Sequence, residues 1–341
     1  MSNLSESKNK GNKRILTYSD NPIHHLYELI DEKLLNTCLK EIGSGKSLSS
    51  DVDSLESFKK DKDTYIPKLI KEVHLRVYRP SLVNTKQVTV RHKLRSIGKL
   101  NVEDSLLQKA VSKILAPIYE RLFFNFSFGY RNGKSPNDAL SLLHKHITFD
   151  GCRYIIKADL KDYFNAIDHA CLIRFLKENV EDEVIMLLIE QWLNAGVGGC
   201  GDGGCGDGRC GGRVVCGDCT RGLLTGAVLS PLLSNIYLHH ILDTWFVKQV
   251  KPQLRELGIM IRYCDDFVIG FNNLQDAKEV YRALFAHLSQ YKLYLNQIKT
   301  RLISLPPNSD SHHHAFTFLG YHHWLDKTYT GKEVLRRRKV R

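Results

Sequence analysis

The stretch Ile261-Arg262-Tyr263-Cys264-Asp265-Asp266-Phe267-Val268-Ile269 sets two adjacent carboxylates among strand-forming residues. A third acid, Asp159, ends a similar run upstream, Ile155-Ile156-Lys157-Ala158-Asp159. A charged carboxylate that is buried without a partner costs several kcal/mol. Two strands that bring three carboxylates together would make a site for a pair of Mg²⁺ ions, as phosphoryl transfer requires. The alternative is one buried acid on each strand, paired with an Arg or a Lys.

The composition favours a globular protein with a polyanionic partner. The 341 residues have room for two or three subdomains, and 43% hydrophobic with 25% charged residues is an ordinary balance. The net charge of +12 favours nucleic acid as the partner. No apolar run is long enough to cross a membrane, and the N-terminus lacks the apolar core of a signal peptide. Nine cysteines, an odd number, fit a reducing compartment, so we expect a cytoplasmic protein.

The apolar spacing predicts both helices and strands. Helices are expected over 65–78, 104–124, 136–146, 169–179, 182–195, 229–249 and 276–291. Strands are expected over 153–160, 293–305 and 315–325, with strand pairs within 83–97 and 260–271. From residue 153 onward, the order predicts an α+β protein with a sheet of the split βαβ type.

These stretches, taken in order, resemble a reverse transcriptase of the group II intron and retron-type bacterial lineage. The blocks that carry the resemblance are Tyr78-Arg79-Pro80, Leu94–Gly98, Val102-Glu103-Asp104 with Gln108, Ser127–Arg131, Ala158–Phe164, Gly222–Leu238, Tyr263–Asp266, Leu293–Asn296 with Lys299-Thr300, and Phe316–Tyr321. The resemblance implies a right-hand polymerase with fingers and an RRM-like palm sheet. The chain looks like a short form that ends soon after the last block, with the thumb absent or rudimentary.

The resemblance also divides the chain into expected parts. They are a mobile basic arm (1–20), an N-terminal extension (21–60), fingers (61–150), a palm (151–325) with a Gly/Cys-rich insert (198–219), and a basic C-terminal tail (326–341).

The family's catalytic residues map onto matching positions of this chain. Asp159 and Asp265 are expected to ligate two Mg²⁺ ions, with Asp266 as a supporting acid and the backbone carbonyl of Leu160 completing the coordination. Lys299 matches the lysine that protonates the leaving pyrophosphate, although a lysine placed there is equally an anion contact.

Further positions match the family's nucleotide site. Arg95 matches the arginine that clamps the triphosphate, and Arg91 or Lys93 would be the second cation, unless these residues form a solvated basic face. Phe164 matches the aromatic residue that excludes a 2′-hydroxyl, and the alternative is an ordinary core Phe. Leu224-Thr225-Gly226 stands where the family has Pro-Gln-Gly, and Thr225 cannot reach the atoms that Gln reaches.

The insert between Cys200 and Cys219 has two interpretations. Cys216-Gly217-Asp218-Cys219 is half of a zinc site, which makes Zn²⁺ a candidate second metal. The other cysteine spacings are irregular and the insert has no His, which favours a flexible Gly-rich loop with incidental thiols.

The resemblance implies an RNA-directed DNA polymerase of a group II intron-like, retron-like or defence-associated element. Its expected partners are an RNA template, a DNA or RNA primer, dNTPs, and an intron RNA or other structured non-coding RNA, with a protein that supplies the thumb as a further option. Template-independent or RNA-primed DNA synthesis would use the same acids. A non-catalytic RNA-binding scaffold on a polymerase fold is the alternative from another class, and the three intact acids argue against it.

Overall fold

The computed structural model of the protein describes residues 23–44, 52–90, 93–195, 197–198, 220–306 and 314–340. They fall into two compact units, each built from two stretches of chain. The helical unit holds the described residues up to Ile118 together with His169–Ser230, and the sheet unit holds Tyr119–Asp168 together with those from Pro231 onward. The expected arm (1–20), Arg91 and the cysteines of the insert lie outside the described residues.

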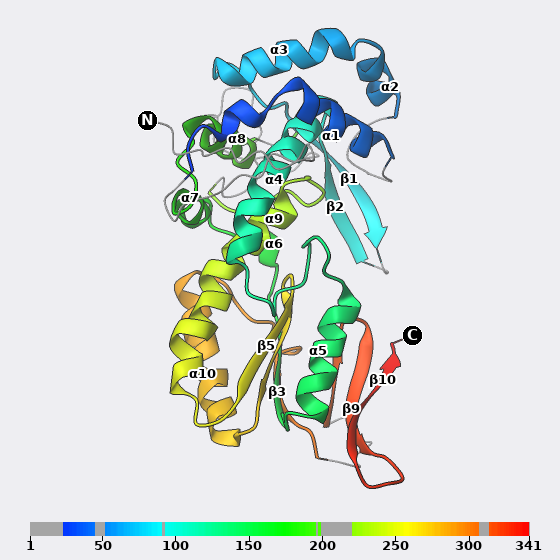
Figure 1. The fold of residues 1–341 in the computed structure, drawn as a ribbon, viewed down its shortest axis with the longest axis vertical. Helices are drawn as coiled ribbons and strands as arrows, with labels where there is room; N and C mark the ends of the chain where they lie inside the picture. The colour runs from blue at the N-terminus through cyan, green and yellow to red at the C-terminus, as the bar shows by residue number, and fades with distance from the viewer. Residues whose placement is uncertain are drawn as a thin grey trace, which may run out of the picture. The chain divides into compact units, whose positions relative to one another are not determined.

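The helical unit consists of helices and one small sheet (Figure 1). Strand β1 pairs antiparallel with β2, which confirms the expected strand pair, and its other edge pairs parallel with the short strand β4. The elements are η1 (Leu26–Leu29), α1 (Glu32–Ser44), α2 (Val52–Lys60), α3 (Lys62–His74), β1 (Val83–Val90), β2 (Lys93–Lys99), α4 (Val102–Leu122, which crosses the boundary at Ile118), α7 (His169–Lys177), α8 (Glu183–Leu193) and β4 (Val197–Gly198).

One buried carboxylate joins three segments of the helical unit. Asp104, at the start of α4, accepts hydrogen bonds from the Tyr78 hydroxyl at 2.5 Å and from Trp192 Nε1 at 3.0 Å. It also accepts one from the backbone N–H of Ser81 at 3.1 Å. Burial raises the pKa of Asp104, and these donors oppose the shift. Two of the sequence blocks, at Tyr78 and at Asp104, are therefore joined through one side chain.

The sheet unit holds two antiparallel sheets. Their elements are α5 (Pro136–Thr148), β3 (Tyr154–Asp159), α6 (Tyr163–Ala166), α9 (Ser230–Leu238), the π-helical turns η2 (His239–Asp243) and η3 (Phe246–Val250), η4 (Lys251–Gln253), β5 (Gly258–Tyr263), β6 (Asp266–Phe271), α10 (Leu274–Gln290), β7 (Arg301–Ser304), β8 (Ala315–Phe318), β9 (Tyr321–Lys327) and β10 (Glu333–Lys339). With the helical unit, they confirm the α+β class.

The larger sheet has the strand order β5-β6-β3-β7, and every neighbouring pair is antiparallel. The order along the chain, one strand, helices, two strands, a helix and a strand, is that of the expected split βαβ sheet. Strands β3 and β5 lie between α10 and α5 (Figure 1). Ile155 of β3 is buried in a core cluster with Leu140 and Leu143 of α5. Since side chains alternate along a strand, Lys157 and Asp159 lie on the face of Ile155.

The segment expected to be a basic tail forms part of the second sheet, which has the order β10-β9-β8. Strand β10 pairs antiparallel with β9 from Glu333 to Lys339. Leu335 is buried in the same core cluster as Leu325 of β9 and Leu143 of α5. This apolar anchor explains why a run of cations is ordered as a strand instead of a free end. Searched over the described residues, the protein has no helix long and apolar enough to cross a membrane.

Candidate active site

The two acids of the opening stretch lie at a two-residue turn between β5 and β6. Cys264 and Asp265 form the turn, and Asp266 is the first residue of β6. Asp266 is the cross-strand partner of Asp159, the last residue of β3. Side chains of such partners have Cβ atoms about 5 Å apart on the same face of the sheet. The structure therefore brings the three acids together at one end of the larger sheet.

Burial and neighbouring charges shift the pKa values of Asp265 and Asp266. Burial raises the pKa of Asp265, and the neighbouring charges of Asp266 and Asp159 raise it further. Burial also raises the pKa of Asp266, while the ammonium of Lys157 opposes the shift. An additional positive charge nearby would therefore stabilise the ionised form of each of these two carboxylates.

Two lysines supply positive charge in this structure. Lys299 Nζ donates to Asp159 Oδ2 at 3.0 Å, and Lys157 Nζ donates to Asp266 Oδ1. The ammonium of Lys157 also lies 5.9 Å above the ring of Phe318. Lys157 was not among the predicted site residues. The signal for it was its position two residues before Asp159, which puts both side chains on one face of the strand.

The donor chemistry of this cluster fits Mg²⁺, which prefers carboxylate and carbonyl oxygens. Leu160 pairs with Leu295 through an isolated bridge that uses the carbonyl of Asp159 and the N–H of Lys161. This bridge leaves the carbonyl of Leu160 on the side away from Leu295. The three acids lie near one another, but their carboxylate groups are not close enough to surround a metal ion. Within the part of the chain that the structure describes, no three or more His, Cys, Asp or Glu side chains are gathered as for a metal ion.

Phe164 lies on α6, a single helical turn that follows Asp159. The preceding Tyr163 is buried, and its hydroxyl donates to the carbonyl of Ser234 at 2.6 Å. Phe164 itself is only half-buried, and its ring centroid lies 5.7 Å from that of Tyr163 in an edge-to-face arrangement. Phe164 is thus partly open to solvent, and its role in excluding a 2′-hydroxyl stays a prediction.

The remaining nucleotide-site candidates lie in the helical unit. Arg95 is a residue of β2, and Thr225-Gly226 forms a turn that packs on the same strand. The backbone N–H of Gly98 donates to the carbonyl of Thr225 at 2.8 Å. Gly226 has a φ of +97°, and a Cβ there would lie 2.5 Å from Ile97 Cγ2. The structure thus brings the strand of Arg95 and the Thr225-Gly226 turn together.

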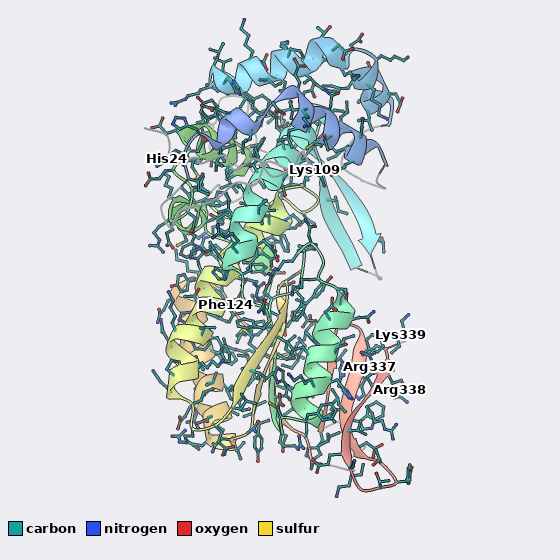
Figure 2. All side chains as sticks on the ribbon, viewed as in Figure 1. His24, Lys109, Phe124, Arg337, Arg338 and Lys339 are labelled. Atoms are coloured by element: carbon teal, nitrogen blue, oxygen red, sulfur yellow. The ribbon has the colours of Figure 1, made fainter. Side chains whose placement is uncertain are left out.

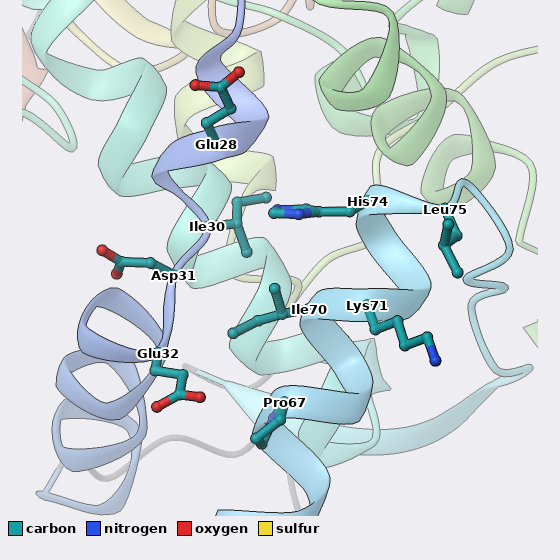
Figure 3. A pocket seen from close by; sticks show the side chains of 9 residues that line it. All are labelled: Glu28, Ile30, Asp31, Glu32, Pro67, Ile70, Lys71, His74 and Leu75. Carbon is teal, nitrogen blue, oxygen red and sulfur yellow. The ribbon is translucent and has the colours of Figure 1, made fainter.

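The helical unit also has an open pocket of about 520 Å³ between the segment 28–32 and helix α3 (Figure 3). Four of its nine lining residues are apolar, among them Ile30 and Ile70, and the other five are Glu28, Asp31, Glu32, Lys71 and His74. None of the predicted site residues lines it. With three carboxylates against one lysine, this pocket is a poor place for phosphate groups.

A family model of the reverse transcriptases (RNA-dependent DNA polymerases) matches residues 84–323. This range contains all three acids and most of the chain. The protein belongs to the reverse transcriptase family. Members of this family use Mg²⁺ in catalysis, in agreement with the oxygen donors at the end of the larger sheet.

Curated relatives place this reverse transcriptase near intron-encoded proteins. It is 29% identical to the group II intron-encoded protein LtrA of Lactococcus lactis in an alignment of 217 positions that covers 60% of this chain and 33% of LtrA. It is 26% identical to protein YkfC of Escherichia coli in an alignment of 259 positions that covers 67% of this chain and 63% of YkfC. It is 32% identical over 159 residues to an uncharacterized protein in a cob intron of Schizosaccharomyces pombe, covering 47% of this chain and 18% of that protein. The chain therefore matches about a third of the length of LtrA.

Proposed function

We propose that this reverse transcriptase is an RNA-directed DNA polymerase that extends a primer 3′-hydroxyl with dNTPs. The observation that carries the proposal is the meeting of Asp159, Asp265 and Asp266 at one end of a split βαβ sheet. Lys157 and Lys299 pair with Asp266 and Asp159, and no lysine or arginine pair is seen at Asp265 among the described residues. The charges of Asp266 and Asp159 raise the pKa of Asp265, and a cation bound beside the three acids would relieve that repulsion.

The acids and one backbone carbonyl would hold two Mg²⁺ ions. Asp159 and Asp265 are the main ligands, Asp266 supports them, and Leu160 contributes its carbonyl. When bound, such ions lower the pKa of an attacking hydroxyl and neutralise charge on the leaving pyrophosphate. In the present structure the ammonium groups of Lys157 and Lys299 hold two of these carboxylates in place.

The other residues bind and select the nucleotide. Lys299, released from Asp159, would donate a proton to the pyrophosphate or contact it as a cation. Arg95 would hold the triphosphate, because a guanidinium stays charged and binds phosphate oxygens in pairs, and Arg91 or Lys93 would add the second cation. The half-buried ring of Phe164 would exclude a 2′-hydroxyl and favour dNTPs. The Thr225-Gly226 turn would shape the pocket beside the incoming base.

The names of the relatives suggest the biological setting. LtrA is a group II intron-encoded protein, and the S. pombe relative lies in an intron. We propose that this chain belongs to a group II intron-like, retron-like or defence-associated element, with an intron RNA or other structured non-coding RNA as its partner. Sequencing the RNA that co-purifies with the protein would distinguish these settings.

The proposal is tested by primer extension on a homopolymer RNA template with a DNA primer. We expect the wild-type protein to incorporate dNTPs in the presence of Mg²⁺ and Asp265→Asn to be inactive. Incorporation by D265N at the wild-type rate would overturn the assigned site. Incorporation that persists without template would favour template-independent synthesis. Binding of structured RNA without incorporation by either protein would favour a scaffold.

A further inference from the structure

A fully buried arginine, Arg262, contacts the turn formed by Cys264 and Asp265. Arg262, on β5, forms a two-pronged ion pair with Asp243, and both side chains are 0% exposed. Arg262 Nε donates to Asp243 Oδ1 at 2.7 Å, and Arg262 Nη2 donates to Oδ2 at 2.6 Å. Replacing such a pair with apolar side chains of similar size is often neutral or stabilising. Stability alone therefore does not explain why a charged pair stands here.

The third guanidinium nitrogen connects the ion pair to the turn. Arg262 Nη1 donates to the carbonyl of Cys264 at 3.2 Å and to Asn235 Oδ1 at 2.9 Å. Asn235 Nδ2 in turn donates to the carbonyl of Gly129 at 2.5 Å. Three of the sequence blocks, around Gly129, Asn235 and Cys264, thus meet through two polar side chains of the sheet unit.

The carbonyl of Cys264 belongs to the central peptide of the turn, which is the group that decides the turn type. Cys264 has a φ of 58°, whereas Asp265 does not have a positive φ. This combination matches a type II′ turn, in which only the first central residue has a positive φ, whereas type I′ needs a positive φ at both. In a type II′ turn the first central position is usually Gly, so a Cys there is strained and must be held by its surroundings.

The central peptide links Arg262 to Asp265. Its carbonyl accepts a hydrogen bond from Arg262, and its nitrogen belongs to Asp265. Rotating this peptide would break the hydrogen bond to Arg262 and would also turn the Cα of Asp265, which carries the carboxylate side chain. The orientation of the peptide and the direction of the Asp265 side chain are therefore linked.

The helix that supplies Asp243 is itself deformed. Asp243 is the last residue of the π-helical turn η2, which continues α9. π-helical turns are rare and occur frequently at functional sites. The wider turn changes the direction of the residues that follow Asn235 on the same helix, and Asn235 and Asp243 both reach the one guanidinium.

We infer that Arg262 is a positioning residue, held by Asp243 and Asn235, that fixes the central peptide of the Cys264-Asp265 turn and so aims the Asp265 carboxylate at the metal site. Its consequence for catalysis rests on the polymerase function proposed above. The inference concerns direction, not charge: the guanidinium is needed because its planar fork reaches Asp243, Asn235 and the turn together.

The test compares two paired substitutions. Arg262→Met with Asp243→Leu removes the buried ion pair and leaves apolar side chains of similar size. Arg255→Met with Glu279→Leu removes a more exposed arginine–carboxylate pair of the sheet unit, with Nη1–Oε2 at 3.1 Å, and also takes the Arg255 side chain away from Asp276 of α10. The readouts are kcat and KM for primer extension, and the melting temperature with EDTA and with Mg²⁺.

We expect R262M/D243L to fold and to melt a few degrees below the wild type in EDTA, because Asn235 Oδ1 and the Cys264 carbonyl lose a buried donor. Its kcat should be about 10- to 100-fold lower, with KM for the primer–template unchanged. Its melting temperature should rise less on adding Mg²⁺ than that of the wild type. R255M/E279L should keep the wild-type kcat. A wild-type kcat in folded R262M/D243L would overturn the inference.

Arg262→Lys keeps the inference testable if the double variant does not fold. Lysine retains the charge opposite Asp243 but cannot also reach Asn235 and the Cys264 carbonyl, so kcat should fall about tenfold or more. A wild-type kcat in R262K would contradict a directional role.

A wild-type protein that incorporates no nucleotide would remove the polymerase proposal alone. The Mg²⁺-dependent melting shift would then decide the inference: an equal shift in the wild type and R262M/D243L would overturn it. The absence of any shift in the wild type would overturn both.

Discussion

At the scale of single residues, we expect the three acids to favour cation binding at the expense of the metal-free fold. The pKa of Asp265 is raised by burial and by the nearby Asp266 and Asp159. Its protonated form therefore contributes stability that is complete below the ordinary aspartate pKa near 4 and is lost as the pH rises through the raised value. At neutral pH the ionised group opposes folding.

Asp265→Asn is therefore expected to stabilise the metal-free protein while abolishing incorporation. At pH 7 in EDTA we expect a gain of about 1 kcal/mol in the free energy of unfolding, because the amide removes the buried charge. The gain should shrink toward pH 4, where the wild-type acid is protonated. Urea denaturation across this pH range measures it. A D265N protein less stable than the wild type at pH 7 would show that the acids do not repel one another.

Sequence reasoning found the acids but not their partners. Asp159, Asp265 and Asp266 lie in short motifs in which acidic residues follow strand-forming ones, and this pattern indicates a metal-binding site. Lys157 and Arg262 lie inside strands, and a single cation in a strand sequence indicates only a solvated or ion-paired side chain. Their partners Asp266 and Asp243 are set by the pairing of β3 with β6 and by the path of α9 into η2. Neither can be read from spacing along the chain.

At the scale of elements, the block Ser127–Arg131 is explained by its contact with β5 and with the Cys264-Asp265 turn. The backbone N–H of Phe128 donates to the carbonyl of Arg262 at 2.8 Å, and Arg262 N–H donates to the carbonyl of Phe126 at 2.8 Å. The next residue, Gly129, packs against Cys264 of the turn. A Cβ at Gly129 would overlap Cys264 Sγ and lie 2.5 Å from the Cys264 backbone nitrogen.

Gly129→Ala is expected to move the catalytic turn. We expect a loss of about 2 kcal/mol in stability from overpacking, and a fall of about 10- to 100-fold in kcat. The control is Gly133→Ala, where a Cβ meets nothing within 4 Å but the φ of +72° is strained. G133A should lose about 1 kcal/mol and keep its kcat. Equal loss of kcat in both variants would mean that the effect is general.

The basic strand β10 offers a second prediction at this scale. Figure 2 shows Arg337, Arg338 and Lys339 along this strand, and all three are exposed. If these cations contact the primer–template, Arg338→Gln with Lys339→Gln should lower the slope of log affinity against log salt by about 2. Lys40→Gln with Lys60→Gln, on exposed positions of α1 and α2, makes the same change of net charge. Titrating a labelled primer–template at several salt concentrations measures the slope, and equal slopes for both variants would refute a contact at β10.

The spacing of apolar residues predicted most helices and strands. It failed where contacts between distant segments determine the local structure. The strand pairs within 83–97 and 260–271 were predicted and confirmed. The helix expected over 229–249 begins at Ser230 but changes to π-helical turns after Leu238. The strand expected over 293–305 forms only at Arg301–Ser304. The segment expected to be a tail forms strand β10, because Leu335 is buried in the core cluster. The cations that follow Leu335 made this apolar anchor hard to recognise in the sequence.

At the scale of the whole molecule, the chain passes between the two units three times, at the boundaries after Ile118, Asp168 and Ser230. Each unit is thus completed only by a later stretch of chain. The functional boundaries expected for fingers (61–150) and palm (151–325) remain a prediction, because packing and function need not divide a chain at the same residues. We expect such interleaved units to unfold together.

Asp104→Ala tests this coupling from the helical unit. The substitution leaves Tyr78, Trp192 and the Ser81 N–H without their buried acceptor and should cost about 3 kcal/mol. Calorimetry should show one transition at a lower temperature. Asp63→Ala, at an exposed ion pair of α3, should change stability by less than about 0.5 kcal/mol. Two separate transitions, only one of them shifted, would show that the units unfold independently.

Strand β10 also has a consequence for the protein in solution. Among the described residues it is the outermost strand of its sheet, and an outermost strand presents backbone groups that a second copy could pair with. The consecutive cations Arg336–Lys339 would face their own counterparts in such a pair and repel them. Dissolved salt screens this repulsion. High ionic strength, which strips polyanions from a basic protein, would therefore also remove its main protection against edge-to-edge aggregation.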